Sequence, residues 1–131
     1  MQKELTPTEI ASMSEVLAKY MGVTVERLYP ENKKEGQSGL HFTFPKDMKL
    51  PYSLIYRNCS MESIRYHSSW DWIHEVWEKV SSEEVDGMNQ YWYQIELAIC
   101  GNDIQEAFWA LHRAITFINN LKQQNENNKS I

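Results

Sequence analysis

The chain has 131 residues, which is enough for one domain around one hydrophobic core and too few for two. Hydrophobic residues make up 42% and charged residues 24%, a composition typical of a folded protein and not of a disordered one. Thirteen basic and eighteen acidic side chains give a net charge of −5, which disfavours non-specific attraction to the phosphate backbone of a nucleic acid.

The first predicted helix covers residues 7–21. Thr6 is a suitable N-cap, Pro7 suits the first helical position, and Glu9 completes a capping box. Apolar residues then recur at helical spacing until Gly22, which predicts the end of the helix. The following residues 30–39 are polar and predict a solvated loop within the same domain.

Strands are predicted in the next part of the chain. Residues 40–44 alternate between apolar and polar side chains, which is typical of a strand with one buried face. Residues 52–56 predict a second strand and residues 62–66 a weaker third. The segment 57–60 between them has the composition of a turn.

A second helix is predicted to begin at Ser68 or Ser69. Its apolar side is predicted to hold Trp70, Ile73, Val76, Trp77 and Val80. Glu75 and Glu78 lie on the opposite side and face solvent, and Trp72 lies at the border. We therefore expect Trp70 and Trp77 to belong to the core and Trp72 to reach the surface.

Residues 91–99 alternate over nine positions, which predicts a central strand with Tyr93 in the core. Residues 101–103 predict a break, followed by a last helix over about 103–122 with a wide apolar stripe. The segment 123–131 is polar and is expected to be a frayed tail. Residues 1–122 are thus predicted to form a single α+β domain, in which three helices pack on an antiparallel sheet of about three to five strands.

Motifs for catalysis and phosphate binding are missing from the sequence, which has no Walker A, GxGxxG, GxSxG or HExxH pattern. Cys59 and Cys100 belong to no CxxC pattern and predict free thiols in a reducing compartment. The polar N-terminal segment predicts no signal peptide, and no apolar run is long enough to span a bilayer. We expect a cytoplasmic protein that is not an enzyme and needs no cofactor.

His67, Asp71 and His74 follow at i, i+4 and i+7, a spacing that could place three metal ligands on one side of a helix. His67 is expected to precede the first helical turn, however, and Asp71 also suits a helix N-terminus. A structural role is the favoured interpretation. A metal-dependent hydrolase at these three residues is kept as an alternative.

The negative charge is concentrated in the second half of the chain. Residues 1–66 carry nine basic and eight acidic side chains, net +1, whereas residues 67–131 carry four and ten, net −6. Such a surface attracts a basic partner and repels nucleic acid. The alternative interpretation is a solvated face that keeps a small protein soluble.

Trp109 lies outside the apolar stripe of the last predicted helix, beside Gln105 and Arg113. Trp and Arg are enriched in interface hot spots, and a surface Trp beside an Arg could also stack on a nucleotide ring. Coverage of the indole by a loop is the alternative. The residues predicted to bind a partner are Trp109, Arg113, Gln105, Trp72, Glu75 and Glu78.

Five short blocks of the sequence together form a known pattern: EVLAKYMG at 15–22, YHSSWDWI at 66–73, VWEKV at 76–80, IQEAF at 104–108 and ITFINN at 115–120. In these blocks the chain resembles a family of short uncharacterised proteins of bacteriophages and mobile elements. His74 and Glu75 depart from the family pattern, and residues 23–65 match nothing in it. The resemblance implies a phage-linked origin and supplies no functional residues.

The first functional hypothesis is a non-enzymatic protein that inhibits a host defence system through acidic and aromatic residues. A CRISPR effector with a basic RNA channel is one such target. The partner would be a host or phage protein with a basic surface, and the oligomeric state is left open. A small-ligand or nucleotide binder around Trp109 and Arg113 is the second hypothesis, and the metal-dependent hydrolase is the third.

Overall fold

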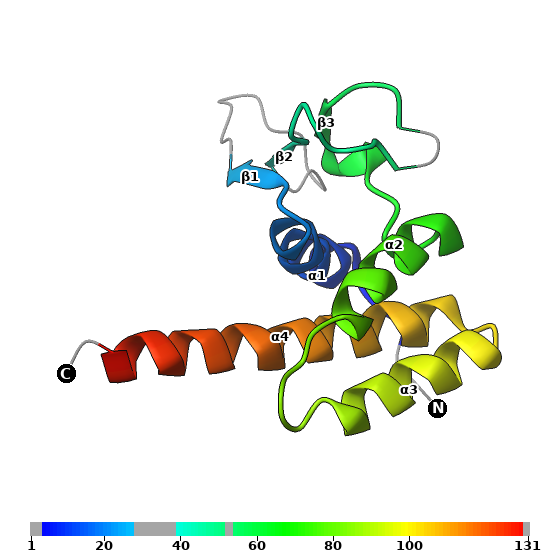
Figure 1. Cartoon of the computed structure of the whole chain (residues 1–131). Coiled ribbons are helices and arrows are strands. Elements are labelled where there is room, and N and C mark those ends of the chain that lie inside the picture. Colours follow the sequence, from blue (N-terminus) through cyan, green and yellow to red (C-terminus); the bar gives the residue numbers. More distant parts are fainter. Residues whose placement is uncertain (1–3, 28–38, 52–53, 130–131) are drawn as a thin grey trace.

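The described part of the chain contains four α-helices and a three-stranded antiparallel sheet in a computed structural model (Figure 1). The structure describes residues 4–27, 39–51 and 54–129, except for the side chains of residues 125 and 127–129. The α+β class predicted from the sequence is confirmed, with four helices instead of three and three strands. In chain order the elements are α1 (Pro7–Tyr20), β1 (Thr24–Arg27), β2 (Leu40–Thr43), β3 (Asn58–Ser60), a 3₁₀ turn (Met61–Ser63), α2 (Trp70–Ser81), α3 (Asn89–Cys100) and α4 (Ile104–Lys129).

The elements are stacked from one end of the molecule to the other (Figure 1). The sheet and the loop between β2 and β3 lie at one end, α1 and α2 lie in the middle, and α3 and α4 lie at the opposite end. The C-terminal part of α4 extends beyond the other helices. No helix among the described residues is long and apolar enough to cross a membrane.

The predicted capping box starts α1. The Thr6 hydroxyl accepts a hydrogen bond from the Glu9 amide, and the Glu9 carboxylate accepts one from the Thr6 amide, both at 3.1 Å. These bonds satisfy two amides that a helix start otherwise leaves unpaired. The helix ends beside Gly22, whose φ of +93° favours glycine. The first predicted helix is thus confirmed to within one residue.

The predicted strand at 40–44 is confirmed as β2, the central strand of the sheet. Phe42 pairs with Val25 on β1 and with Cys59 on β3, so these three side chains share the face that packs on the core.

The strand predictions at 52–56 and 62–66 are wrong for the residues that the structure describes. Residues 54–56 have no regular structure, 61–63 form a 3₁₀ turn, and residues 52–53 lie outside the description. The third strand lies at 58–60, in the segment predicted as a turn. The Phe44 amide donates to the Arg57 carbonyl at 2.8 Å, which fixes the register of the strand that follows. Pairing with β2 therefore selected residues that alternation did not single out.

The strand predicted at 91–99 is also wrong, because these residues form α3. Ile95 and Ala98 are buried, whereas Tyr93 is exposed, so the prediction that Tyr93 is a core residue is wrong as well. Apolar side chains in this segment recur at every second residue, as in a strand, and also at every third or fourth residue, as in a helix. Packing against α4 favours the helical arrangement, in which Tyr91 contacts Phe117 with ring centroids 4.8 Å apart.

The last helix begins where the sequence predicts, because the Asp103 carboxylate accepts a hydrogen bond from the Glu106 amide at 3.1 Å. It then continues to Lys129 and passes residue 122, where the prediction ended it. Ile118 is the last buried residue among those whose side chains the structure describes, and the turns after it project from the body of the molecule (Figure 1).

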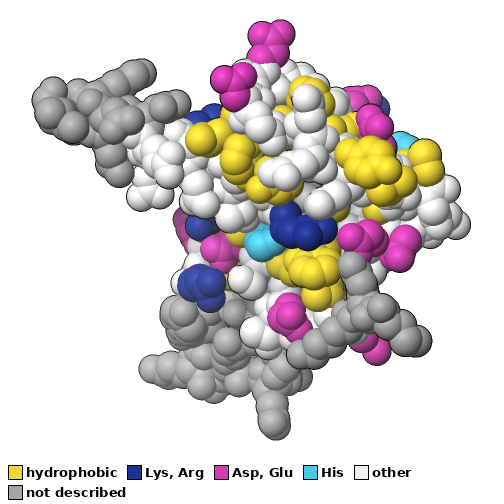
Figure 2. Space-filling model, turned by 90° about the horizontal axis from the view of Figure 1, so that it is seen from below, with side chains coloured by type: hydrophobic (Ala, Val, Ile, Leu, Met, Phe, Trp, Pro, Cys, Tyr) yellow, Lys and Arg dark blue, Asp and Glu magenta, His cyan; other side chains and the backbone are white. Residues whose placement is uncertain are grey.

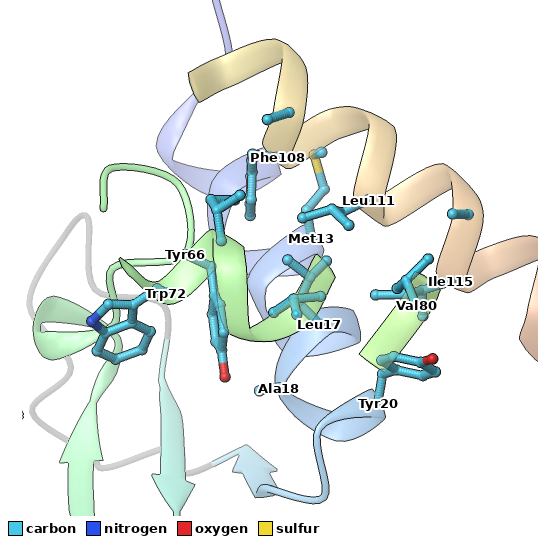
Figure 3. Packing of buried hydrophobic residues seen from close by; sticks show 14 of the residues in the cluster. Met13, Leu17, Ala18, Tyr20, Tyr66, Trp72, Val80, Phe108, Leu111 and Ile115 are labelled. Atoms are coloured by element: carbon cyan, nitrogen blue, oxygen red, sulfur yellow. The ribbon is translucent and has the colours of Figure 1, made fainter. Parts of the chain in front are cut away.

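The core joins all layers of the molecule (Figure 3). Leu17 of α1 points toward Leu111 and Ile115 of α4. Trp72 is completely buried, with its ring edge-on to Tyr66 at a centroid distance of 4.9 Å and to Phe44 at 6.3 Å. The prediction that Trp72 reaches the surface is therefore wrong. It sits at the start of α2, where the sheet and the segment before the helix both cover it.

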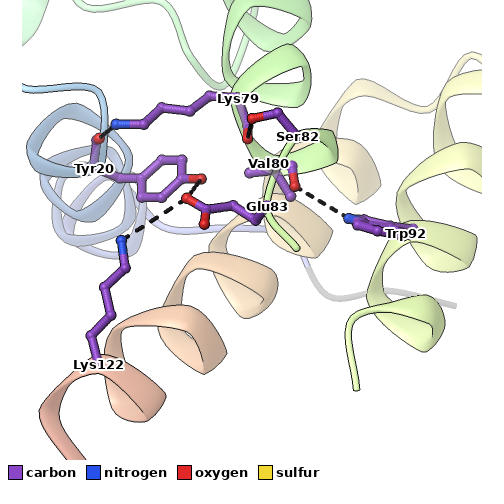
Figure 4. A network of polar contacts seen from close by, with 7 residues as sticks. All are labelled: Tyr20, Lys79, Val80, Ser82, Glu83, Trp92 and Lys122. Carbon is purple, nitrogen blue, oxygen red and sulfur yellow. Dashed lines mark hydrogen bonds and ion pairs between the residues drawn. The ribbon is translucent and has the colours of Figure 1, made fainter. Parts of the chain in front are cut away.

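Trp70 and Trp77 are half-buried and pack against this core, as the apolar side of the second predicted helix indicated. A polar cluster then joins the ends of α1 and α2 to α4 (Figure 4). The Tyr20 hydroxyl donates to Glu83 at 2.8 Å, and Glu83 also pairs with Lys122 at 3.9 Å. Burial raises the pKa of the Tyr20 hydroxyl, and the bond to Glu83 raises it further.

Lys79 closes the same cluster from α2. Its ammonium group donates to the Tyr20 carbonyl and lies 4.4 Å from the centroid of the Tyr20 ring. On the other side of α2, the Trp92 indole donates to the Val80 carbonyl at 3.2 Å and so attaches α3 (Figure 4). The first contact satisfies a carbonyl at the negative end of α1, and the second satisfies one at the negative end of α2. Together they fix α1 and α3 relative to α2.

Candidate protein-binding site

The predicted metal ligands do not form a ligand group. Among the described residues, no three His, Cys, Asp or Glu side chains are placed to hold a metal ion. His67 precedes α2 and packs against Phe108 with ring centroids 6.2 Å apart, whereas Asp71 and His74 are exposed on α2. Burial, and to a lesser extent Arg65, lowers the pKa of His67. These observations support the structural role that the sequence favoured for His67.

Both cysteines are free, as the sequence predicts. Cys59 is half-buried on β3, where burial raises the pKa of its thiol. A raised pKa reduces the thiolate fraction and hence the nucleophilicity at neutral pH. Cys100 is exposed at the end of α3.

The structure brings Trp109 and Arg113 together on α4. The guanidinium carbon lies 4.6 Å from the centroid of the indole, and Arg113 also pairs with Glu106 at 3.6 Å. Trp109 is 37% exposed, so neighbouring groups cover most of the ring. Gln105 is half-buried beside them in the chain. Arg113 already occupies the position above the ring that a stacked ligand would use, and the sequence did not predict the pairing with Glu106.

The acidic side of α2 is present but lacks the predicted aromatic residue, since Trp72 is in the core. Glu78 is exposed as expected, whereas Glu75 is half-buried. Burial raises the pKa of Glu75, and the nearby Lys49 partly offsets this effect. The side chains of α2 therefore form a charged surface without a large apolar contact at its centre.

Exposed apolar side chains lie elsewhere. Among the described residues, the large hydrophobic side chains that are exposed are Ile55, Tyr56, Tyr93, Leu97 and Trp109. Tyr93 is 63% exposed and Leu97 54%, and both are on α3. With the exposed Glu96 and Cys100 they occupy i, i+3, i+4 and i+7, which places all four on one side of the helix. We call this set, Tyr93, Glu96, Leu97 and Cys100, the α3 face.

The α3 face lies on an acidic segment of the chain, in which Glu83 pairs with Lys122 and Glu106 pairs with Arg113 of α4. The segment 82–106, which contains α3 and both adjoining loops, has six acidic residues and no Lys or Arg, a net charge of −6. The acidic residues are Glu83, Glu84, Asp86, Glu96, Asp103 and Glu106. Figure 2, which shows the molecule from the side of α3 and α4, displays separate groups of hydrophobic side chains with acidic side chains beside them. No basic side chain within this segment offsets the field at the α3 face.

No protein-family model, curated protein or solved structure matches this chain. The resemblance to phage proteins in the YHSSWDW block therefore stays a prediction. The structure gives this block a physical role of its own, because Tyr66 and Trp72 pack against each other in the core.

The sequence interpretation missed the α3 face because it treated this segment as a strand. A signal was available: Tyr93 and Leu97 are four residues apart, and so are Tyr91 and Ile95. Read with helical spacing, these pairs lie on two different sides of one helix. One pair packs inward, and the other stays exposed beside the residues that the structure describes.

Proposed function

We propose that the protein acts by binding another protein through the α3 face, and that the partner presents a basic surface. The observation that carries this proposal is the exposure of Tyr93 and Leu97 on a helix whose segment has six acidic residues and no Lys or Arg. Glu83 and Glu106 pair with basic side chains of α4, and the other four acidic residues are exposed. The proposal keeps the acidic and aromatic surface expected from the sequence and moves it from α2 to α3.

The apolar part of the face is suited to act as a binding anchor. A single exposed leucine is common on protein surfaces, but two large side chains one turn apart form a contiguous contact. The helix that carries them is held by the Tyr91–Phe117 contact and by the hydrogen bond from Trp92. Because the helix is already fixed, binding would not need to order its backbone, which lowers the entropic cost of association.

The charges select the partner. Acidic groups around an apolar centre favour a partner whose own apolar contact is surrounded by Lys or Arg, and they speed its encounter at low salt. Two copies of the α3 face would instead bring twelve acidic residues of two segments together, since each segment contributes six. Like charges across an interface are unfavourable, so a symmetric contact of α3 with α3 is disfavoured.

The class of partner follows from the sequence resemblance. We propose a host defence component as the target, with a CRISPR effector and its basic RNA channel as one example. Every member of the set predicted from sequence except Trp72 is exposed or partly exposed: Glu75, Glu78, Gln105, Trp109 and Arg113. They would contribute at the margin of the contact, where charged groups alter the association rate more than the affinity.

The test is a capture experiment from host lysate with matched variants, followed by binding kinetics on the captured protein. We expect Leu97→Ser to weaken binding by about 30-fold, the equivalent of a hot-spot loss of about 2 kcal/mol. Glu96→Lys should slow association and make it less dependent on salt. Ile55→Ser changes a more exposed apolar residue at the other end of the molecule, so it is the control and should leave binding unchanged.

A captured protein that binds Leu97→Ser and Glu96→Lys as tightly as the parent would contradict the proposal. In that case Trp109→Ala would show whether the α4 surface carries the contact instead.

A further inference from the structure

We infer that two copies of this chain associate head to tail, with the loop between β2 and β3 of one copy docked on the α3 face of the next. The inference uses the same α3 face as the proposed function, but its ligand is the chain itself. The loop contributes Ile55 and Tyr56, which are 79% and 74% exposed and are the most exposed large hydrophobic side chains that the structure describes.

The loop is closed at its neck by Arg57. The Arg57 guanidinium donates to the carbonyls of Pro45 and Met48 at 2.6 and 2.7 Å. The Arg57 carbonyl accepts a hydrogen bond from the Phe44 amide at 2.8 Å. These three bonds join the two ends of the loop, and Ile55 and Tyr56 directly precede the residue that makes them.

The inner side of the same loop is anchored in the core. Met48, Leu50 and Leu54 pack against the buried cluster, whereas the next two residues, Ile55 and Tyr56, turn outward. Leu54 on one side and Arg57 on the other therefore hold Ile55 and Tyr56 in place before they bind. Ordered anchors lose little conformational entropy on association, which makes them effective interface residues.

Charge complementarity selects the α3 face as the surface that receives this loop. Residues 39–66 carry four basic and two acidic side chains, net +2, whereas the segment 82–106 carries −6. The basic residues are Lys46, Lys49, Arg57 and Arg65. A contact of the loop with the α3 face pairs opposite charges around two apolar centres, and contacts between two identical surfaces pair like charges.

The two surfaces cannot meet within one molecule. Figure 1 shows the sheet and its loop at one end and α3 at the other, with α1 and α2 between them. The contact is therefore intermolecular, and it joins two different surfaces. Such a heterologous contact leaves one loop and one α3 face free in each dimer, so it extends into longer chains or closes into a ring.

Head-to-tail association would regulate the proposed binding. It covers the α3 face with a loop of another copy, so a basic partner would have to displace that loop. With two apolar anchors on each side, the contact is expected to be weak and to form at high protein concentration.

Sedimentation velocity with two complementary variants tests this arrangement. One variant, Ile55→Ser with Tyr56→Ser, lacks the loop anchors and keeps the α3 face. The other, Tyr93→Ser with Leu97→Ser, lacks the α3 anchors and keeps the loop. All four side chains are exposed, and far-UV circular dichroism and thermal melting check that both variants remain folded.

We expect the parent chain to grow beyond 15.5 kDa as its concentration rises from micromolar to near-millimolar. Each variant alone should stay at 15.5 kDa, and an equimolar mixture should form a complex of twice that mass and no larger. The mixture stops at a dimer because each variant keeps one of the two surfaces. Should either variant unfold, Lys46→Glu with Lys49→Glu replaces the loop variant and Glu96→Lys with Asp103→Lys replaces the α3 variant.

A parent chain that stays at 15.5 kDa at near-millimolar concentration would overturn the inference. Self-association of the loop variant alone would also overturn it, because it would show a symmetric contact through α3. Both results leave the proposed function intact, since the capture of a basic partner is measured at low protein concentration with Leu97→Ser. Conversely, loss of the proposed function would not alter the masses of the mixed variants.

Discussion

The second and third helices in the chain, α2 and α3, have the same length of 12 residues, and both carry large apolar side chains. In α2 four apolar side chains are fully buried: Trp72, Ile73, Val76 and Val80. The helix packs on α4, and Phe44 and Tyr66 enclose Trp72. In α3 the covered side packs mainly on α4, and Tyr93 and Leu97 stay exposed. The comparison separates apolar residues that stabilise this fold from apolar residues that the fold does not need, and the second group is where a binding surface is expected.

The largest expected effect on stability is at the buried apolar side chains of α2. Trp72→Ala should lower the free energy of unfolding by about 3–5 kcal/mol, because it empties a site closed by Tyr66 and Phe44. Urea denaturation followed by circular dichroism measures the change. Trp70→Ala, at a half-buried position of the same helix, is the control and should cost less. Equal losses of unfolding free energy in both variants would show that complete burial of Trp72 adds nothing to its contribution to stability.

A medium effect is expected where α1, α2 and α4 meet. Tyr20→Phe removes the hydroxyl that donates to Glu83, which should cost about 1 kcal/mol, the usual net value of one hydrogen bond. The phenyl ring keeps the contact with Lys79, so the packing itself is unchanged. Lys122→Met breaks only the longer pair with Glu83 and should cost less. Denaturant titration measures the free energy of unfolding of both variants. A larger loss for Lys122→Met than for Tyr20→Phe would show that the ion pair, and not the hydrogen bond, dominates the cluster.

The stability of the protein is expected to depend on pH through two partly buried histidines, His67 and His112. Burial lowers the pKa of His67 and of His112 below the usual 6.5, and the Nδ1 atom of each ring is buried with no hydrogen-bond partner among the described residues. A folded-state pKa below the unfolded value means that the unfolded chain binds protons first. Stability is thus complete above about pH 6.5 and falls as the pH drops through the unfolded and then the folded pKa.

Denaturation measured between neutral and mildly acidic pH tests this effect. His67→Gln and His112→Gln should each reduce the loss of stability on acidification relative to the parent. His74, which is exposed on α2, supplies the control, and His74→Gln should leave the pH profile unchanged. A profile that responds to His74→Gln alone would contradict the assignment.

The smallest effect on stability is expected at the exposed apolar side chains of the α3 face. Leu97→Ser should change the free energy of unfolding by no more than about 0.5 kcal/mol, as surface substitutions do. The same variant is expected to lose partner binding, so stability and binding separate at this residue. A loss of several kcal/mol would show instead that Leu97 supports the fold and would remove the reason for a binding role.

Local sequence patterns were sufficient to predict the elements whose pattern fits only one kind of secondary structure. Thr6, Pro7 and Glu9 specify a helix start through hydrogen bonds between neighbours in the chain, and the structure contains them. The alternation at 40–44 marked the central strand, and Asp103 marked the start of the last helix. The surplus of acidic residues in the second half is likewise a property of the sequence itself.

Tertiary packing decided the rest. The segment 91–99 satisfies both a two-residue and a helical period, and contact with α4 made it a helix and so exposed Tyr93. Trp72 lies at the border of its own helix, yet Tyr66 and Phe44 from other segments bury it completely. The third strand depends on Arg57 meeting Phe44 across a loop. In each case the free energy comes from residues distant in the chain, which no local pattern contains.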